Sequence, residues 1–144
     1  MLQFDKEVYR KMQEDAEAAF PDECCGFLFG NERNGIRNIE DILPVMNAKE
    51  GDKKRRFEIA PLDYLRAERY AEERSLLLFS IYHSHPNHPA VPSEHDRVAA
   101  QPYFSYVIVS VMDGKQADTR SWILNDQQQF EEENIAQEII NHSY

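Results

Sequence analysis

The sequence predicts an α/β fold, in which helices pack against a mixed β-sheet. Two strongly apolar runs, residues 76–82 and 103–112, have the length and composition of central strands that are covered on both faces. Apolar residues at helical spacing occupy residues 5–20 and 62–74. Helical segments that lie between strands in this way are typical of α/β domains, and we expect a sheet of about six strands.

The N-terminal part of the chain predicts one helix and one hairpin. The helix over residues 5–20 ends before Pro21, because proline cannot continue a helix. Residues 24–30 are apolar, residues 36–45 alternate between apolar and polar, and an Asn-Gly turn signal at residues 34–35 separates the two segments. These two segments therefore predict an antiparallel hairpin.

The rest of the chain continues the alternation of helices and strands. Residues 47–56 are polar and charged and predict a loop, residues 56–60 predict a short strand, and Pro61 suits the first position of the helix after it. Three more elements are predicted: a helix over residues 93–100, a strand over 119–124 that pairs with the apolar run before it, and a helix over 126–141. No repeat or long linker divides the chain, so we expect a single domain over residues 1–144.

Composition excludes several classes of protein. A chain of 144 residues is long enough to bury a substantial core. Its 26 acidic residues against 16 basic residues give a net charge of −10, which argues against binding to nucleic acid. No apolar run approaches the length of a membrane span, and residues 1–10 lack the apolar core of a signal peptide. We therefore expect a cytoplasmic protein without a membrane anchor; the oligomeric state is not indicated.

Two local features have ordinary explanations. The basic run Lys53-Lys54-Arg55-Arg56 predicts a solvated loop, with a docking patch for an acidic partner as the alternative. The adjacent residues Cys24 and Cys25 could form a disulfide only through a strained ring. We expect both to be small packing residues in a reducing compartment.

The segment His83-Ser84-His85-Pro86 directly follows the apolar run at residues 76–82. Alternate side chains of a strand point to the same face, so His83 and His85 would project together and could bind one divalent ion such as zinc. Asp96, in the first turn of the helix expected over residues 93–100, could supply a third ligand and leave a fourth position for water. An isolated histidine at a strand end, however, is usually a satisfied polar residue.

Ser93 and Asp96 also have a structural explanation, since Ser-x-x-Asp resembles the capping pair of a helix. The two interpretations are compatible, because a capped first turn would hold Asp96 rigidly for coordination. A hydrolytic site would further need a general base outside the ligand set. Glu23, at the start of the first apolar strand, is a candidate, but spacing alone does not choose it over Asp22 or Glu94.

The sequence resembles the JAB1/MPN/Mov34 metalloenzymes, or JAMM proteases. Their pattern is an upstream Glu, then His-x-His-Pro, six residues, Ser, two residues and Asp, which Glu23, His83, His85, Ser93 and Asp96 fill here. The resemblance implies a single JAB1/MPN-type metallopeptidase domain with one Zn²⁺ per chain, held by the two histidines and the aspartate with water as fourth ligand. It implies that Glu23 is the general base and then the acid, and that Ser93 donates a hydrogen bond to the oxyanion.

The chain has no large insertion around this motif and is similar to the small stand-alone prokaryotic members of the family. The resemblance implies hydrolysis of the amide after the C-terminal Gly-Gly of a ubiquitin-like sulfur carrier protein, whose tail would bind by adding a strand to a sheet edge. One alternative is a catalytically silent MPN scaffold that binds protein partners. Another is a relative of the DNA-repair-associated RadC proteins, which the net charge argues against. His88 lies outside the motif, and we expect it to be a histidine in a surface loop.

Overall fold

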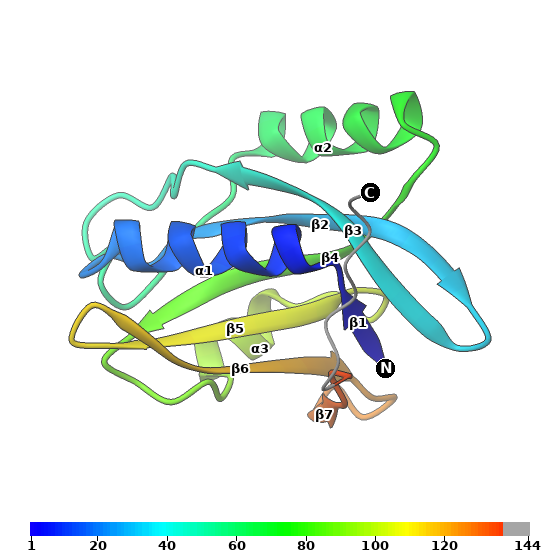
Figure 1. The fold of residues 1–144 in the computed structure, drawn as a ribbon. Helices are drawn as coiled ribbons and strands as arrows, with labels where there is room; N and C mark the ends of the chain where they lie inside the picture. The colour runs from blue at the N-terminus through cyan, green and yellow to red at the C-terminus, as the bar shows by residue number, and fades with distance from the viewer. Residues whose placement is uncertain (137–144) are drawn as a thin grey trace.

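The computed structural model has a seven-stranded mixed sheet at its centre, and it describes residues 1–136 (Figure 1). The strand order is β1-β3-β2-β4-β5-β6-β7, and neighbours are antiparallel except for β1 with β3 and β4 with β5. The α/β prediction with a mixed sheet is therefore confirmed. The strands are β1 (Leu2–Phe4), β2 (Cys25–Arg33), β3 (Ile36–Val45), β4 (Leu77–Pro86), β5 (Ser105–Met112), β6 (Lys115–Leu124) and β7 (Phe130–Glu133).

Helices cover both faces of the sheet. The helices are α1 (Lys6–Ala19), α2 (Pro61–Glu73) and α3 (Glu94–Ala99). Successive residues of β2 point to opposite faces, and they divide the core accordingly: Leu28 packs in the same cluster as Met12 of α1, whereas Phe27 and Phe29 pack with Ala67 of α2. In Figure 1, α1 and α2 are seen as separate layers on the sheet. No helix among residues 1–136 is long and apolar enough to cross a membrane.

Strand β4 is central, between antiparallel β2 and parallel β5. Its residues from Phe79 to the end of the strand are buried, as expected for a strand covered on both faces. The register with β2 sets Cys25 opposite His83. This pairing brings the residue just before β2, Glu23, to the end of β4 that carries the histidines.

Most of the predicted elements are confirmed, but two are wrong and one strand was missed. Residues 56–60 do not form a strand; they are part of the connection from β3 to α2. The helix predicted over residues 126–141 is replaced by a turn and by β7, which pairs with β6; the part beyond residue 136 lies outside the described residues. The missed element is β1, whose three residues are too few to show a periodic pattern.

The turn before β7 explains why the helix does not form. The Asn125 side chain accepts hydrogen bonds from the backbone N–H groups of Gln127 and Gln129, and Gln128 has a positive φ of 62°. Asparagine side chains stabilise turns in this way and compete with helix formation. Phe130 then packs against Tyr106, with 5.9 Å between the ring centroids. Tertiary contacts therefore override the helical pattern of this acidic segment.

Candidate metal centre

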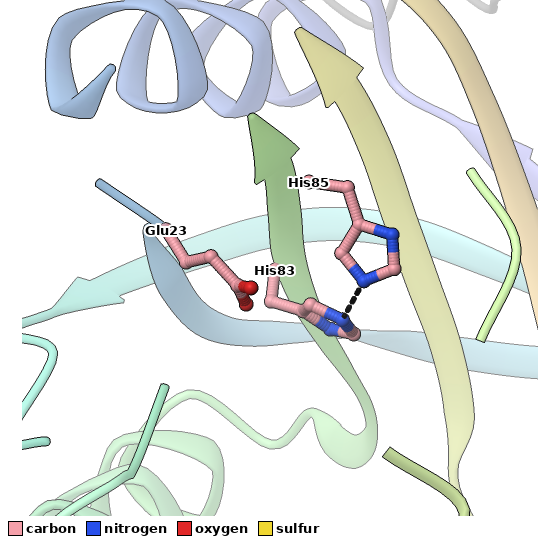
Figure 2. A group of neighbouring side chains, drawn as sticks. All are labelled: Glu23, His83 and His85. Carbon is pink, nitrogen blue, oxygen red and sulfur yellow. Dashed lines mark hydrogen bonds between the residues drawn. The ribbon is translucent and has the colours of Figure 1, made fainter. Parts of the chain in front are cut away.

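His83 and His85 extend from the same face of β4 near its C-terminal end (Figure 2). Both are buried, with exposed fractions of 1% and 7%, and their Nε2 atoms lie 3.2 Å apart. Strand geometry alone accounts for the pairing, since residues two apart share a face. The His85 Nδ1–H group donates to the carbonyl oxygen of Pro89 at 2.9 Å. This bond fixes the tautomer that leaves the lone pair of His85 Nε2 free for a metal.

Asp96 reaches the two imidazoles from the first turn of α3. Its Oδ2 atom lies 3.2 Å from His85 Nε2 and 3.4 Å from His83 Nε2. The turn is a capping box: the Asp96 N–H donates to Ser93 Oγ at 3.0 Å, and the Ser93 N–H donates to Asp96 Oδ2 at 2.9 Å. The capping interpretation of these two residues is thus confirmed. The same bonds hold the Asp96 carboxylate against the histidines.

The three atoms suit a tetrahedral zinc ion. Zinc ligands at 2.0–2.1 Å from the metal with tetrahedral angles lie roughly 3.3–3.4 Å from one another. The Nε2 atoms of His83 and His85 and the Oδ2 atom of Asp96 form a triangle with sides of 3.2, 3.2 and 3.4 Å. Burial lowers the pKa of His83, which favours the neutral form that binds metal. The donor set therefore fits zinc in chemistry and in spacing.

A second carboxylate, that of Glu23, points toward the imidazoles from the segment that leads into β2 (Figure 2). Glu23 offers an oxygen that lies, with one ring nitrogen each of His83 and His85, in a group whose atoms are all within 4.8 Å of one another. The residue is only 4% exposed, and its Oε1 atom has no hydrogen-bond partner among the described residues. A buried carboxyl oxygen without a partner is costly, which makes it a candidate for a functional role.

The surroundings of Glu23 favour the protonated, uncharged form of its carboxyl at neutral pH. Its pKa is raised to about 8, mainly by burial; His85 opposes the rise, and the nearby carboxylates of Asp96 and Asp52 add to it. A general base works best when its pKa lies close to the operating pH. Asp96 behaves differently: although burial opposes ionisation, His83 and the hydrogen bonds around Asp96 hold its pKa well below the ordinary value. The two carboxylates are thus suited to different tasks.

The structure distinguishes Glu23 from the two other acids considered as a base. Glu94 is exposed and binds Arg97, with 2.9 Å between Glu94 Oε2 and Arg97 Nε. Asp22 is half-buried and is not in the group of side chains that could hold a metal ion among residues 1–136. Only Glu23 of the three candidates joins the histidines.

Backbone contacts hold Glu23 in place from two directions. On one side, the Cys24 N–H donates to Ser84 Oγ at 2.8 Å and the Ser84 N–H donates to the Cys24 carbonyl at 3.2 Å, which ties Glu23 to the residue between the two histidines. On the other side, the Glu23 N–H donates to the Lys53 carbonyl at 2.7 Å. The Asn47 side chain also donates to the Glu23 carbonyl at 3.0 Å.

Two residues near the centre were not anticipated from the sequence. Asn47 joins both ends of the connection from β3 to α2, because its amide donates to the Arg56 carbonyl at 3.1 Å and its oxygen accepts from the Glu58 N–H at 3.1 Å. An asparagine at the start of a polar loop is a recognisable signal for such a role. The ring of Phe57 stacks on His83 with 4.4 Å between centroids. No local pattern indicates this second contact.

Two cavities flank the centre. The aromatic cavity has a volume of about 410 Å³, and the charged cavity has a volume of about 290 Å³. The walls of the aromatic cavity include Phe57, Ile59, Tyr64, Ile81, His83, His95, Asp96, Tyr106, Ile108 and Phe130. The charged cavity is lined by Glu23, Arg55, His85, His88, Pro89, Val91 and Ser93. Ser93 is exposed and shares the charged cavity with Glu23.

Four other residues near the centre, among them the two cysteines, are accounted for by packing or hydrogen bonds. Cys24 and Cys25 are buried free thiols, as expected for packing residues. Tyr82 is buried and its hydroxyl donates to Asp15 at 2.6 Å. The Trp122 indole donates to the carbonyl of Ala90 at 3.0 Å and thereby holds the segment between His85 and α3.

Comparison with known proteins identifies one matching family and several similar proteins. The family described as prokaryotic homologs of the JAB domain matches residues 5–125. The chain is 32% identical over 121 residues to a CysO-cysteine peptidase of Mycobacterium tuberculosis, a match that covers 83% of this chain and 80% of that protein. It is 28% identical over 116 residues to a desampylase of Pyrococcus furiosus, a match that covers 81% of this chain and 76% of that protein.

Solved structures resemble the whole described fold. The solution structure of DSY2949 from Desulfitobacterium hafniense superposes with a TM-score of 0.85 at 27% sequence identity. That match covers 99% of this chain and 96% of the other. The likeness therefore includes the strands and helices that position the candidate metal centre.

Proposed function

Because this chain belongs to the prokaryotic JAB family, we propose that it is a zinc-dependent metallopeptidase that cleaves a ubiquitin-like sulfur carrier protein. The bond cleaved is the amide after the carrier's C-terminal Gly-Gly. The observation that carries the proposal is a buried carboxyl, that of Glu23, with a partnerless oxygen beside three ligand atoms at the spacing zinc requires.

His83, His85 and Asp96 are the residues that would hold the zinc ion. Bound zinc supplies acidity to a water molecule and polarises a carbonyl. Glu23 accepts a proton from the attacking water and delivers it to the leaving amine, and its raised pKa suits both transfers. Its lack of a partner in the described structure leaves its oxygen free for these transfers.

Ser93 is the proposed donor to the oxyanion that develops on the carbonyl. Its Oγ atom already accepts a hydrogen bond from the Asp96 N–H, so its own hydroxyl proton remains available for donation. The capping box therefore fixes the position of the oxygen without consuming its donor. Removing an oxyanion donor of this kind lowers kcat by about 10²–10³ in other hydrolases.

The names of the relatives support the substrate class. One relative is named a CysO-cysteine peptidase and another a desampylase, and the first name describes a peptidase that acts on CysO joined to cysteine. We place the reaction in the cytoplasm, where the buried thiols of Cys24 and Cys25 stay reduced.

The test combines zinc content with cleavage of a carrier protein that is extended beyond its Gly-Gly. We expect about one zinc per chain in the parent protein, loss of zinc in His83→Ala, and retention of zinc in Glu23→Gln. Both variants are expected to lose cleavage. His88→Ala is the matched control for zinc content and is expected to keep its zinc, because His88 is not among the three proposed zinc ligands. Mass spectrometry of the products should place the cut after Gly-Gly.

Three outcomes would reject the proposal. One is a parent protein that fails to bind zinc even when zinc is added. Another is a zinc-loaded parent that cuts the carrier at other bonds. The third is a zinc-loaded parent that binds the carrier without cutting it, which would favour the scaffold alternative.

A further inference from the structure

The charged cavity contains groups of both signs, although the chain as a whole is strongly acidic. Glu23 lies on its wall close to the histidines, and Arg55 lines the same cavity. His88 adds an imidazole that can donate a hydrogen bond in its neutral form. A carboxylate and a guanidinium on one small cavity complement a ligand that carries an amine and a carboxylate close together.

The position of Glu23 indicates which half of the substrate enters the charged cavity. Proton transfer to the leaving amine requires that the amine come within hydrogen-bond reach of the Glu23 carboxyl. Glu23 and the proposed oxyanion donor Ser93 both line the charged cavity, and neither lines the aromatic cavity. The leaving group therefore occupies the charged cavity.

Arg55 is available to bind an anion there. Its side chain is 80% exposed, and its ion pair with Asp52 is loose, with 3.7 Å between Arg55 Nε and Asp52 Oδ2. A guanidinium stays protonated at all relevant pH values and presents paired donors that match a carboxylate. An incoming carboxylate can therefore bind Arg55 without first breaking a strong interaction.

The loop that carries Arg55 is anchored to Glu23. The backbone carbonyl of Lys53, two residues before Arg55, accepts a hydrogen bond from the Glu23 N–H at 2.7 Å. The backbone carbonyl of Arg56, the residue after Arg55, accepts a hydrogen bond from the Asn47 side-chain amide at 3.1 Å. The same amide donates to the Glu23 carbonyl at 3.0 Å. The base and the arginine thus belong to one hydrogen-bonded unit, which sets Arg55 beside the reaction centre.

The aromatic cavity is unsuited to a carboxylate. Its walls are mostly aromatic and aliphatic, and its lining residues include no lysine or arginine that could pair with a carboxylate. The two cavities therefore differ in the charge that they accept. A terminal carboxylate finds a cationic side chain, Arg55, in the charged cavity and none among the lining residues of the aromatic one.

We propose that the charged cavity binds the leaving group as an α-amino acid or short peptide with a free C-terminal carboxylate, with Arg55 as the residue that binds this carboxylate. The inference rests on the proposed function and specifies its substrate. Hydrolysis breaks the C–N bond and forms a C–O bond to water, one water proton passes through Glu23 to the nitrogen, and no oxidant is needed. A lysine ε-amine of a folded protein brings no carboxylate to this position and is a poorer leaving group for this enzyme.

The experiment compares two substrates that differ by one charge. The sulfur carrier protein of the same organism is prepared with either alanine or alaninamide after its Gly-Gly, and kcat/KM is measured for both with the zinc-loaded protein. We expect the parent to prefer the free carboxylate by about tenfold, mainly through KM. Arg55→Gln is expected to lose this preference, because its kcat/KM for the alanine substrate falls to about that for the alaninamide substrate.

Arg56→Gln is the matched control, since Arg56 is the neighbouring exposed arginine and does not line the charged cavity. It is expected to keep the tenfold preference. Equal kcat/KM for the two substrates in the parent, or a preference that survives in Arg55→Gln, would overturn the inference and leave the proposed function intact. Failure to cleave either substrate would overturn the proposed function, and the inference with it.

Discussion

Replacement of Glu23 by glutamine is expected to stabilise the zinc-free protein by an amount that grows with pH. The substitution keeps the shape of the side chain and removes its ability to ionise. Burial raises the pKa of this carboxyl from 4.5 to about 8 in the folded state, so the parent holds a proton there that the unfolded chain has released. Glutamine does not ionise, so its contribution to the free energy of unfolding does not change with pH in this way.

The sign and size of the effect follow from this difference in pKa. Below pH 4.5 the carboxyl is protonated in both states, and its contribution to stability is fully present. Between pH 4.5 and 8 the folded state binds more protons than the unfolded state, so the free energy of unfolding falls by about 1.4 kcal/mol for each pH unit. Above pH 8 the loss levels off at about 3–5 kcal/mol. That is a large part of the total stability of a typical domain, about 5–15 kcal/mol.

The assay is urea unfolding of the zinc-free parent and of Glu23→Gln at a series of pH values from 5 to 9. The fluorescence of the single tryptophan, Trp122, reports the transition. We expect the two proteins to differ little at pH 5 and the variant to be more stable by several kcal/mol at pH 9. Glu68→Gln is the matched control, because Glu68 is exposed on α2; its stability is expected to follow that of the parent at every pH.

Parallel stability curves for the parent and Glu23→Gln over this range would refute the reasoning. They would mean that the carboxyl ionises in the folded state as easily as in water, so that it is neither buried nor poised as a base. Repeating the series with zinc bound gives a second check. A nearby cation favours the carboxylate, so the advantage of the variant at high pH is expected to shrink.

The other predictions concern the supports of the site. Ser93→Ala is expected to lower kcat by about 10²–10³ while zinc content is kept, and Ser93→Thr to retain activity, because threonine keeps both the capping oxygen and the hydroxyl proton; equal kcat for the alanine variant and the parent would exclude the oxyanion role. Ser84→Ala leaves the buried Cys24 N–H without its acceptor and is expected to cost about 1–3 kcal/mol in urea unfolding, with Ser84→Thr as the control. Gly26→Ala places a Cβ atom 2.6 Å from Tyr82 Cζ, well inside contact distance, so a loss of at least about 1–3 kcal/mol is expected; an unchanged midpoint would show that the ring can move aside.

Local patterns in the sequence were sufficient to predict that the three proposed zinc ligands lie close together. His83 and His85 share a face because side chains of a strand alternate, and this holds for any environment of the strand. Asp96 is held by a capping box with Ser93, which depends only on four consecutive residues at the start of a helix. The strands of the hairpin and the helices α1 and α2 likewise follow from periodicity within each segment.

The choice of Glu23 as the proposed base depends on tertiary structure. Glu23, Asp22 and Glu94 are equivalent as sequence neighbours of predicted elements, and only the register of β2 against β4 brings Glu23 to the histidines. Register between strands some 60 residues apart is set by the burial of both faces of the sheet, which no local pattern contains. The same reason explains the error over residues 126–141, where pairing with β6 decided the conformation.

The connection from β3 to α2 shows most clearly what local sequence determines and what tertiary structure decides. Its composition indicated a polar loop with a basic run, and that much is local information. Its path over the site is decided by the Asn47 hydrogen bonds to Glu23, Arg56 and Glu58, and these join segments that meet only in the folded chain. A loop without its own periodic structure adopts the conformation that satisfies its backbone groups against the rest of the fold, which is why only the tertiary structure could set Arg55 and Phe57 beside the histidines.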